Sequence, residues 1–329
     1  MDHVADIGAD TEAVMRQYEG FAEQYAQGSS PAYAEIAREL AGDREVVDLV
    51  MGLPPGAKRQ PNLLLAAVRY LDGPVSSWEE FRAWLVEHWE QVRAVVLERS
   101  TQTNEVRRLA TMLPVLSSLR GPLALVEVGA SAGLCLYPDR YRYSYDGAAP
   151  VGPADSEVLL ECATSRRVPV PTRVPEVAWR AGIDLSPLDV RDEDDVRWLQ
   201  ALIWPGEKER ERRERLLGAV RVAAADPPLL VAGDMAEKLE SVVAMAPSDA
   251  TLVVMHSAVL PYLPSKRVAA FVQVMDRVLG HWVANEGWRA LPSSWSRTRP
   301  PVDTDFTLAL DGRVVGYTGP HGESLAWAG

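Results

Sequence analysis

Apolar residues recur at helical spacing through the first ~120 residues, without the alternation that marks strands. Pro61 stands where a helix takes proline at its first position. The best-marked helix starts at Ser77, which with Glu80 forms an S-x-x-E capping box ahead of an apolar face that continues to Val96. This pattern predicts an all-helical N-terminal domain over residues 1–120, acting as a cap over a second domain.

The pattern changes after Gly121, where short apolar runs rich in Leu and Val alternate with helical stretches. Such alternation is typical of parallel strands joined by crossover helices. The runs predict five strands, at residues 123–128, 181–185, 229–232, 251–256 and 282–285. Residues 306–317 alternate apolar and polar positions around Asp311-Gly312, which predicts a hairpin. We therefore expect an α/β domain over residues 121–329 that ends in an antiparallel pair.

The composition of the chain argues against some classes of binding partner. Its 329 residues carry 34 Lys and Arg against 46 Asp and Glu, a net charge of −12, which matches a nucleic-acid backbone poorly. The charged segment 207–215 is interpreted as a solvated helix face. No apolar run approaches the ~18 residues of a membrane span, and the acidic N-terminus does not resemble a signal peptide. We expect a cytoplasmic protein with a small-molecule substrate and no nucleic-acid or membrane partner; a homodimer remains open.

Cys135 and Cys162 are the only cysteines of the chain. Two cysteines so far apart are too few for a zinc site or a disulfide framework, which fits a reducing compartment. We therefore expect no metal site.

The most informative stretch follows the first predicted strand. Glu127-Val-Gly129-Ala-Ser-Ala-Gly133 satisfies the relaxed motif of class I methyltransferases, D/E-x-G-x-x-x-G. Glycines there would let the backbone approach a ligand closely, and a helix opening beyond them would present free N–H groups. The acid could contact amino or hydroxyl groups of the ligand. Because S-adenosylmethionine carries no phosphate, the acid suits this cofactor better than a dinucleotide.

The same residues fit two other interpretations. Gly129-Ala-Ser131-Ala-Gly133 is also G-x-S-x-G, the nucleophile elbow of α/β-hydrolases, and Asp234 with His256 or His321 could complete its triad. A hydrolase elbow follows several earlier strands, however, whereas the preceding region is helical here. In the remaining interpretation the glycines only allow tight packing.

Polar residues close the later predicted strands. Asp184, Asp234 and His256 stand at three successive strand ends, where ligands gather in open α/β sheets. The two acids resemble those that hold ribose and adenine in methyltransferases, and His256 is placed to act as a general base. Each also has a structural interpretation, as a helix cap, a turn residue or a buried histidine.

Spacing predicts an insertion between the first two strands. Gly133 and Asp184 are 51 residues apart, whereas a simple βαβ unit places its acid about 20 residues beyond the glycines. We place the insertion at about 137–178. Its residues Arg140 and Tyr141 begin an alternating segment, with Tyr143 and Tyr145, that forms either a hairpin edge or a lid over the substrate.

A further polar cluster at Arg99, Asn104 and Glu105 leads directly into the first strand. It could cap the site, or it could be a solvated helix start.

Several of these segments resemble a bacterial family of similar length, domain of unknown function 2332. The resemblance covers nearly the whole chain and rests on Gln60-Pro-Asn-Leu-Leu-Leu65, Arg99 with Thr101-Gln-Thr-Asn-Glu105, Glu127-Val-Gly-Ala-Ser-Ala-Gly-Leu134, Asp139-Arg-Tyr141, Arg180 with Gly182-Ile-Asp-Leu185, and Trp198-Leu with Trp204-Pro205. It implies a methyltransferase-like fold and no particular reaction. The family pattern has Asn where this chain has Cys135, which implies altered ligand binding if that position touches the ligand.

The leading hypothesis is a Rossmann-like class I methyltransferase sheet with a terminal antiparallel hairpin, in an S-adenosylmethionine-dependent methyltransferase of a small molecule. Cofactor binding is assigned to Glu127, Gly129, Ser131, Gly133, Asp184 and Asp234. The candidate base is His256, and the candidate substrate residues are Arg99, Asn104, Glu105, Arg140 and Tyr141. The alternatives are a serine hydrolase using Ser131 and a catalytically inactive methyltransferase-like binding protein.

Overall fold

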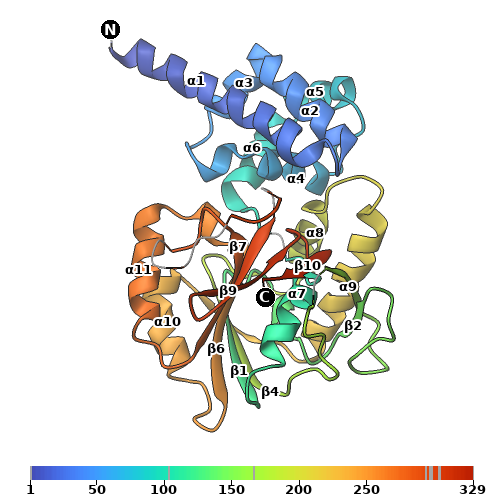
Figure 1. Ribbon diagram of the computed structural model, residues 1–329. Coiled ribbons are helices and arrows are strands. Elements are labelled where there is room, and N and C mark those ends of the chain that lie inside the picture. The colour runs from blue at the N-terminus through green and yellow to red at the C-terminus, as the bar shows by residue number, and fades with distance from the viewer. Residues whose placement is uncertain are drawn as a thin grey trace. The chain divides into compact units, whose positions relative to one another are not determined.

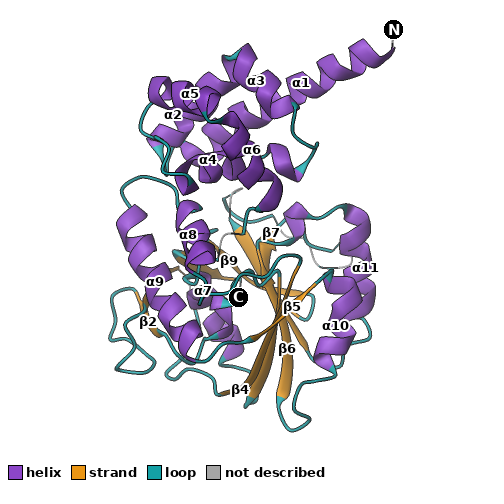
Figure 2. Cartoon of the chain, turned by 180° about the vertical axis from the view of Figure 1, so that it is seen from behind, coloured by secondary structure: helices purple, strands orange, loops and turns teal. Residues whose placement is uncertain are grey.

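The computed structural model describes residues 2–102, 104–165, 167–292, 295, 299–302 and 305–328. Thr103, part of one quoted motif, lies outside the described residues. The chain divides into two compact units, Met1–Thr103 with Glu193–Glu214, and Asn104–Asp192 with Arg215–Gly329. Figures 1 and 2 show the helices of the first unit and the strands and helices of the second.

The first unit is helical in all the elements that the structure describes. Pro61 occupies the first turn of its helix, as the sequence predicts. The elements are α1 (Asp2–Phe21), the π-helical turn η1 (Ala22–Ala26), α2 (Pro31–Gly42), α3 (Arg44–Met51), the 3₁₀ turn η2 (Ala57–Arg59), α4 (Pro61–Tyr70), α5 (Trp78–Glu87), α6 (Trp89–Glu98) and α8 (Glu193–Ala201).

The helix expected after Ser77 is divided in two. The Ser77 hydroxyl accepts the N–H of Glu80 at 3.5 Å, so the predicted cap is confirmed. The helix ends at His88, whose φ of −108° and ψ of 20° leave the helical region, and α6 begins at the next residue. The apolar stripe continued across this break, so periodicity alone could not locate it.

The second unit is built on a ten-stranded, mostly parallel sheet (Figure 1). Its strands are β1 (Leu123–Val128), β2 (Arg142–Tyr145), β3 (Leu159–Ser165), β4 (Val177–Asp184), β5 (Leu229–Ala232), β6 (Thr251–Ser257), β7 (His281–Gly287), β8 (Phe306–Leu310), β9 (Arg313–Thr318) and β10 (Ser324–Trp327). Its helices and turns are α7 (Arg108–Leu116), η3 (Leu134–Leu136), α9 (Glu209–Ala225), which begins in the first unit, α10 (Met235–Val243), η4 (Leu260–Tyr262) and α11 (Ser265–Met275).

The strand order is β2-β3-β10-β9-β8-β7-β6-β1-β4-β5. The five predicted strands become β1, β4, β5, β6 and β7, which are mutually parallel. The predicted hairpin forms from β8 and β9, with Asp311 and Gly312 at positive φ in its turn. The sequence did not predict β3 and β10, which extend the sheet beyond this hairpin.

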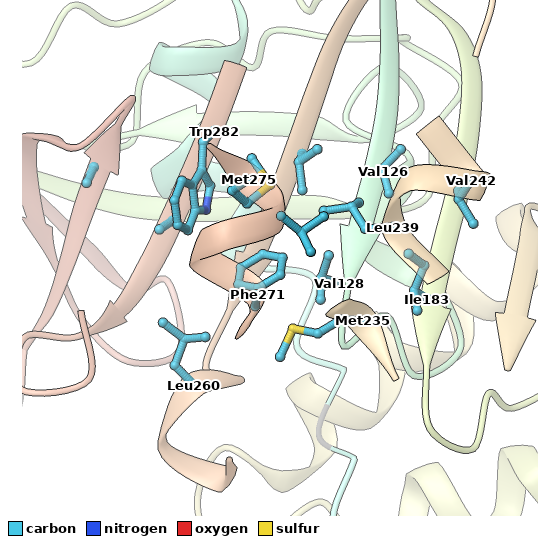
Figure 3. Packing of buried hydrophobic residues seen from close by; sticks show 14 of the residues in the cluster. Val126, Val128, Ile183, Met235, Leu239, Val242, Leu260, Phe271, Met275 and Trp282 are labelled. Atoms are coloured by element: carbon cyan, nitrogen blue, oxygen red, sulfur yellow. The ribbon is translucent and has the colours of Figure 1, made fainter. Parts of the chain in front are cut away.

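One face of the sheet packs on α10 and α11. Val126, Val128 and Ile183 project from the strands toward Leu239 of α10 and Phe271 of α11 (Figure 3). These side chains are at most 1% exposed, and each such burial stabilises the fold by about 1.5–3 kcal/mol. This cluster holds the parallel strands in register.

The opposite face carries α7, which packs against β3, β7 and β8 and is called here the α7 face. Side chains alternate along a strand. Because Val126 and Val128 face α10 and α11, Glu127 between them faces the other way, where its carboxylate lies near Arg108 of α7.

The helix expected after the glycine motif does not form. Only the 3₁₀ turn η3 follows Gly133, so the predicted helix N-terminus is wrong. Pro138 has no N–H to donate to the Leu134 carbonyl, four residues earlier, as a helix requires. That carbonyl instead accepts the Tyr141 hydroxyl at 2.8 Å.

The segment after η3 contributes the sheet edge at β2. Tyr141, Tyr143 and Tyr145, the apolar positions of the alternating segment, are all buried. β2 pairs with β3 in parallel, so the expected hairpin is reduced to one antiparallel bridge between Tyr143 and Val151.

Candidate functional site

Glu127 is a buried carboxylate near the end of β1. It is 5% exposed, and its Oε2 has no hydrogen-bond partner. Burial, followed by the neighbouring Asp184 carboxylate, raises the pKa of Glu127 well above its ordinary value, whereas Arg108 and the Cys135 thiol lower it. Leaving such an oxygen unpaired costs about 1–3 kcal/mol or more. A ligand that supplied a donor there would recover this cost.

Further polar side chains continue this site across the neighbouring strand ends. Ser257 ends β6 and Asn285 lies near the end of β7, and by alternation both face α7. The Ser257 hydroxyl is buried without a partner. Asn285 is held by Thr318 at 2.8 Å and by Thr111 of α7 at 3.4 Å.

Arg108 supplies the positive charge of this site. Its Nε donates to the Pro320 carbonyl at 2.9 Å, and its Nη1 lies 3.5 Å from the Ser257 carbonyl. We call Glu127, Ser257, Asn285 and Arg108 the polar row. The sequence did not identify Ser257 or Asn285 as candidate site residues, because the face of the sheet on which each side chain lies depends on the strand register.

Asp184 fixes the turn that follows β1. Its Oδ2 accepts the N–H of Ser131 at 2.8 Å and its Oδ1 that of Ser186 at 2.9 Å. The N–H of Gly129 donates to Ile183 O at 2.8 Å. The structure therefore brings Glu127, Ser131 and Asp184 together. The Asp184 carboxylate holds the backbone of the turn through these hydrogen bonds.

The glycines of the motif are covered by protein side chains. Gly129 and Gly133 both have φ of +70°. A Cβ on Gly129 would lie 2.9 Å from Val259 Cγ1 and closer still to Cγ2. A Cβ on Gly133 would lie 2.9 Å from Pro228 Cγ. Close packing therefore accounts for both glycines.

A neighbouring glycine allows a direct test of this packing. A Cβ on Gly182 would lie 2.5 Å from Ala130 Cβ and 2.6 Å from Leu230 Cδ2. We expect Gly182→Ala to lower the free energy of unfolding by about 1–3 kcal/mol through overpacking, measured by urea denaturation. The control is Gly287→Ala, because nothing lies within 4 Å of a Cβ there. Equal stability of the two variants would contradict the packing role, and adding Ala130→Gly should recover part of the loss.

His256 lies on the face opposite Glu127, packed against Phe271 of α11 with ring centroids 5.7 Å apart. Its Nδ1 lies 2.7 Å from Glu286 Oε1, and its Nε2 accepts the indole N–H of Trp282 at 2.9 Å. With one nitrogen donating and the other accepting, both positions of the ring are engaged. The structure thus places this candidate base in a buried network on the α10 and α11 face of the sheet.

Asp234 caps α10. Its Oδ1 accepts the N–H of Ala236 at 2.8 Å, and its Oδ2 pairs with Arg267 at 2.6 Å. This arrangement matches the helix-cap interpretation of the sequence.

Ser131 has a φ of +52°, unusual for a residue other than glycine. This strain agrees with a nucleophile elbow, which needs a sharp turn. The helix of that motif is absent, however, and the groups of Asp234 and His256 described above are engaged with other partners. His321 is held through its backbone, to Arg107 and Glu323.

Two of the candidate substrate residues brace η3. Asn104 Oδ1 accepts the N–H of Leu134 at 2.9 Å, and Tyr141 binds the carbonyl of the same residue. Arg140 lies half-exposed beside Asp139 and Asp226.

The other two candidates form ion pairs. Glu105 binds Arg215 through two contacts of 2.8 and 3.1 Å. Arg99 belongs to the first unit, where it pairs with Asp194 and, at 2.5 Å, with Asp195. Within the second unit, the contacts described above hold Arg140, Asp234 and His256 to groups other than Glu127.

Fold and site define a mixed α/β protein with a buried glutamate near the end of a central parallel strand, one carboxyl oxygen of which has no hydrogen-bond partner. The chain belongs to the family described as "Uncharacterized protein conserved in bacteria" (DUF2332), which matches residues 15–327. No curated protein and no solved structure matches the chain. Over the described residues, we find no helix with the length and apolar character needed to cross a membrane.

Proposed function

We propose that this chain is an S-adenosylmethionine-dependent methyltransferase that acts on a small molecule. The observation that carries the proposal is the buried, unpaired carboxylate oxygen of Glu127 in the polar row. An oxygen in such a place favours a ligand with a cationic or hydrogen-bond-donating group.

The strand order supports a nucleoside-type site at this position. Along the sheet, β5-β4-β1-β6-β7 corresponds to the doubly wound order 3-2-1-4-5 of Rossmann-like folds. The order reverses between β1 and β6, and ligands of such sheets bind outside the carboxyl ends of the strands at this reversal. Glu127 and Ser257 stand on these two strands.

The charges of the polar row fit an amino-acid head group. The ammonium group of the methionine portion would favour loss of the Glu127 proton and pair with the resulting carboxylate, and Arg108 would attract the ligand carboxylate. The Ser257 hydroxyl can donate or accept. A pyrophosphate offers no cation to pair with Glu127 and would add negative charge beside Glu127 and Asp184, so a dinucleotide fits less well.

The polar row fits the amino-acid head group of S-adenosylmethionine, whereas the turn at Gly129 fits this cofactor less well. Glu127, Ser257 and Arg108 would hold it, whereas Val259 fills the space over Gly129. When bound, the cofactor supplies an electrophilic methyl group.

The chain's own residues would contribute mainly orientation and the exclusion of water. Because the Nε2 lone pair of His256 is used by Trp282, the arrangement favours an acceptor whose nucleophilic atom needs no deprotonation by this histidine.

Calorimetric titration with S-adenosylhomocysteine tests the proposal. We expect Ser257→Ala to weaken binding by about threefold to tenfold, because one hydrogen bond to the ligand is lost. Thermal stability should stay unchanged, since the hydroxyl has no protein partner.

The matched control is Ser241→Ala, whose exposed hydroxyl bonds only within α10, to Lys238 O. No binding by the unmodified protein, or equal binding by Ser257→Ala, would count against the site.

A second candidate is a methyltransferase-like protein that binds a nucleoside without turnover. The engagement of both His256 nitrogens favours it. Binding of S-adenosylhomocysteine without methyl transfer to a broad acceptor panel would distinguish this candidate.

A further inference from the structure

The turn after β6 lies against the turn after β1. Ala258 has a φ of +58°, and the next residue, Val259, places its side chain over Gly129. A residue other than glycine in this conformation costs of order 1–3 kcal/mol and persists only when its surroundings hold it. The turn therefore needs a specific anchor.

Glu286 of β7 provides that anchor. It is fully buried, and its two carboxylate oxygens lie 2.9 and 3.1 Å from the N–H of Val259. Its Oε1 is also 2.7 Å from His256 Nδ1, and His256 is held in turn by Trp282. Hydrogen bonds to a charged acceptor are roughly twice as strong as neutral ones, so the position of Val259 is well determined.

Val259 controls how closely a ligand can approach the β1 turn. Its two methyl groups occupy the space over Gly129 that would otherwise admit a ligand atom. Val259 is itself only partly buried, so it stands between this turn and solvent. Val259 also packs against the apolar cluster on the face of α10 and α11, so a ligand at the end of β1 that approached the backbone of Gly129 would meet the methyl groups of Val259.

We propose that Glu286 is a positioning residue which, by fixing Val259 over Gly129, limits access to the β1 turn and so determines which ligands the site accepts. This inference rests on the proposed function, because it takes the ligand to lie at the end of β1. The His256–Glu286 network would thereby affect ligand specificity, although it lies on the face of the sheet that packs on α10 and α11.

The experiment compares S-adenosylhomocysteine affinities of the unmodified protein, Val259→Ala, Glu286→Gln and the double variant. We expect Val259→Ala to bind about threefold to tenfold more tightly, because its lost methyl groups open space over Gly129. The double variant should bind no more tightly than Val259→Ala, because Glu286 acts through Val259. The control is Val243→Ala, an equal truncation of a partly buried residue in α10.

Hydrogen exchange at the Val259 amide supplies a readout independent of the ligand. Glu286→Gln should speed this exchange at least about tenfold, since a charged acceptor is lost. Unchanged exchange overturns the positioning role. Equal affinity of Val259→Ala and the unmodified protein overturns the inference alone, whereas binding by no variant overturns the proposed function and the inference together.

Discussion

Arg215→Met is expected to lower the free energy of unfolding by about 3–5 kcal/mol, because it leaves the Glu105 carboxylate buried without its counter-charge. The two side chains are 6% and 5% exposed, and the guanidinium contacts both carboxylate oxygens. Urea denaturation of the full chain measures the loss.

The matched control is Arg213→Met in the same helix. Arg213 pairs with Glu209 at 3.6 Å, and these side chains are 43% and 29% exposed, so we expect a change within about 1 kcal/mol. The double variant Glu105→Leu with Arg215→Met should recover most of the loss, because it removes both charges. Similar effects of Arg215→Met and Arg213→Met would contradict the importance of the buried pair.

Glu127→Gln is expected to abolish most ligand binding while making the protein more stable at neutral pH. The lost interaction with a ligand ammonium should weaken S-adenosylhomocysteine binding by about tenfold to a hundredfold. The gain in stability follows from removing a carboxyl whose burial and whose neighbour Asp184 disfavour its charge. Titration calorimetry and thermal unfolding measure the two effects.

The pH dependence gives the sign of the stability effect. Above the ordinary pKa of 4.5 the unfolded chain loses the Glu127 proton, whereas the folded protein, with its raised pKa, keeps it. The folded state then binds more protons, so stability falls as pH rises between the two pKa values. Each unit of separation corresponds to about 1.4 kcal/mol. Because glutamine does not titrate, its advantage should grow from pH 4.5 upward.

Glu176→Gln is the control, because Glu176 is exposed before the amino end of β4. If Glu127→Gln were instead the less stable variant at every pH, the Glu127 carboxylate would have a stabilising partner within the protein.

The sequence predicts the parallel part of the sheet closely. The predicted bounds of β1 and β5 agree with the structure. β1 is buried throughout, as expected of a continuous apolar run in a covered parallel sheet, whereas β5 is an edge strand whose residues are half-buried or exposed. β3 and β10 were missed because their pairing joins segments far apart in the chain, and β10 has only four residues. Pro138 was a signal against the helix after Gly133, and it was available in the sequence.

The site was predicted less completely than the fold. Glu127 and Asp184 lie together at adjacent strand ends, because the carboxyl ends of neighbouring parallel strands lie at the same edge of the sheet. His256 and Ser257 differ by one position, and alternation sends them to opposite faces. Nothing near Gly129 in the sequence indicates that Val259 covers it. Arg215 looked like part of a solvated charged run because its partner lies 110 residues away.

The discontinuous make-up of the first unit affects how the protein can be divided into fragments. A fragment ending at Thr103 would lack Glu193–Glu214 and with it the acidic partners of two arginines that are little exposed. Arg69 pairs with Glu209, and Arg99 pairs with Asp195. Expressed alone, the fragment would leave both guanidinium groups without these carboxylates. Joining residues 193–214 to it through a flexible linker would restore them.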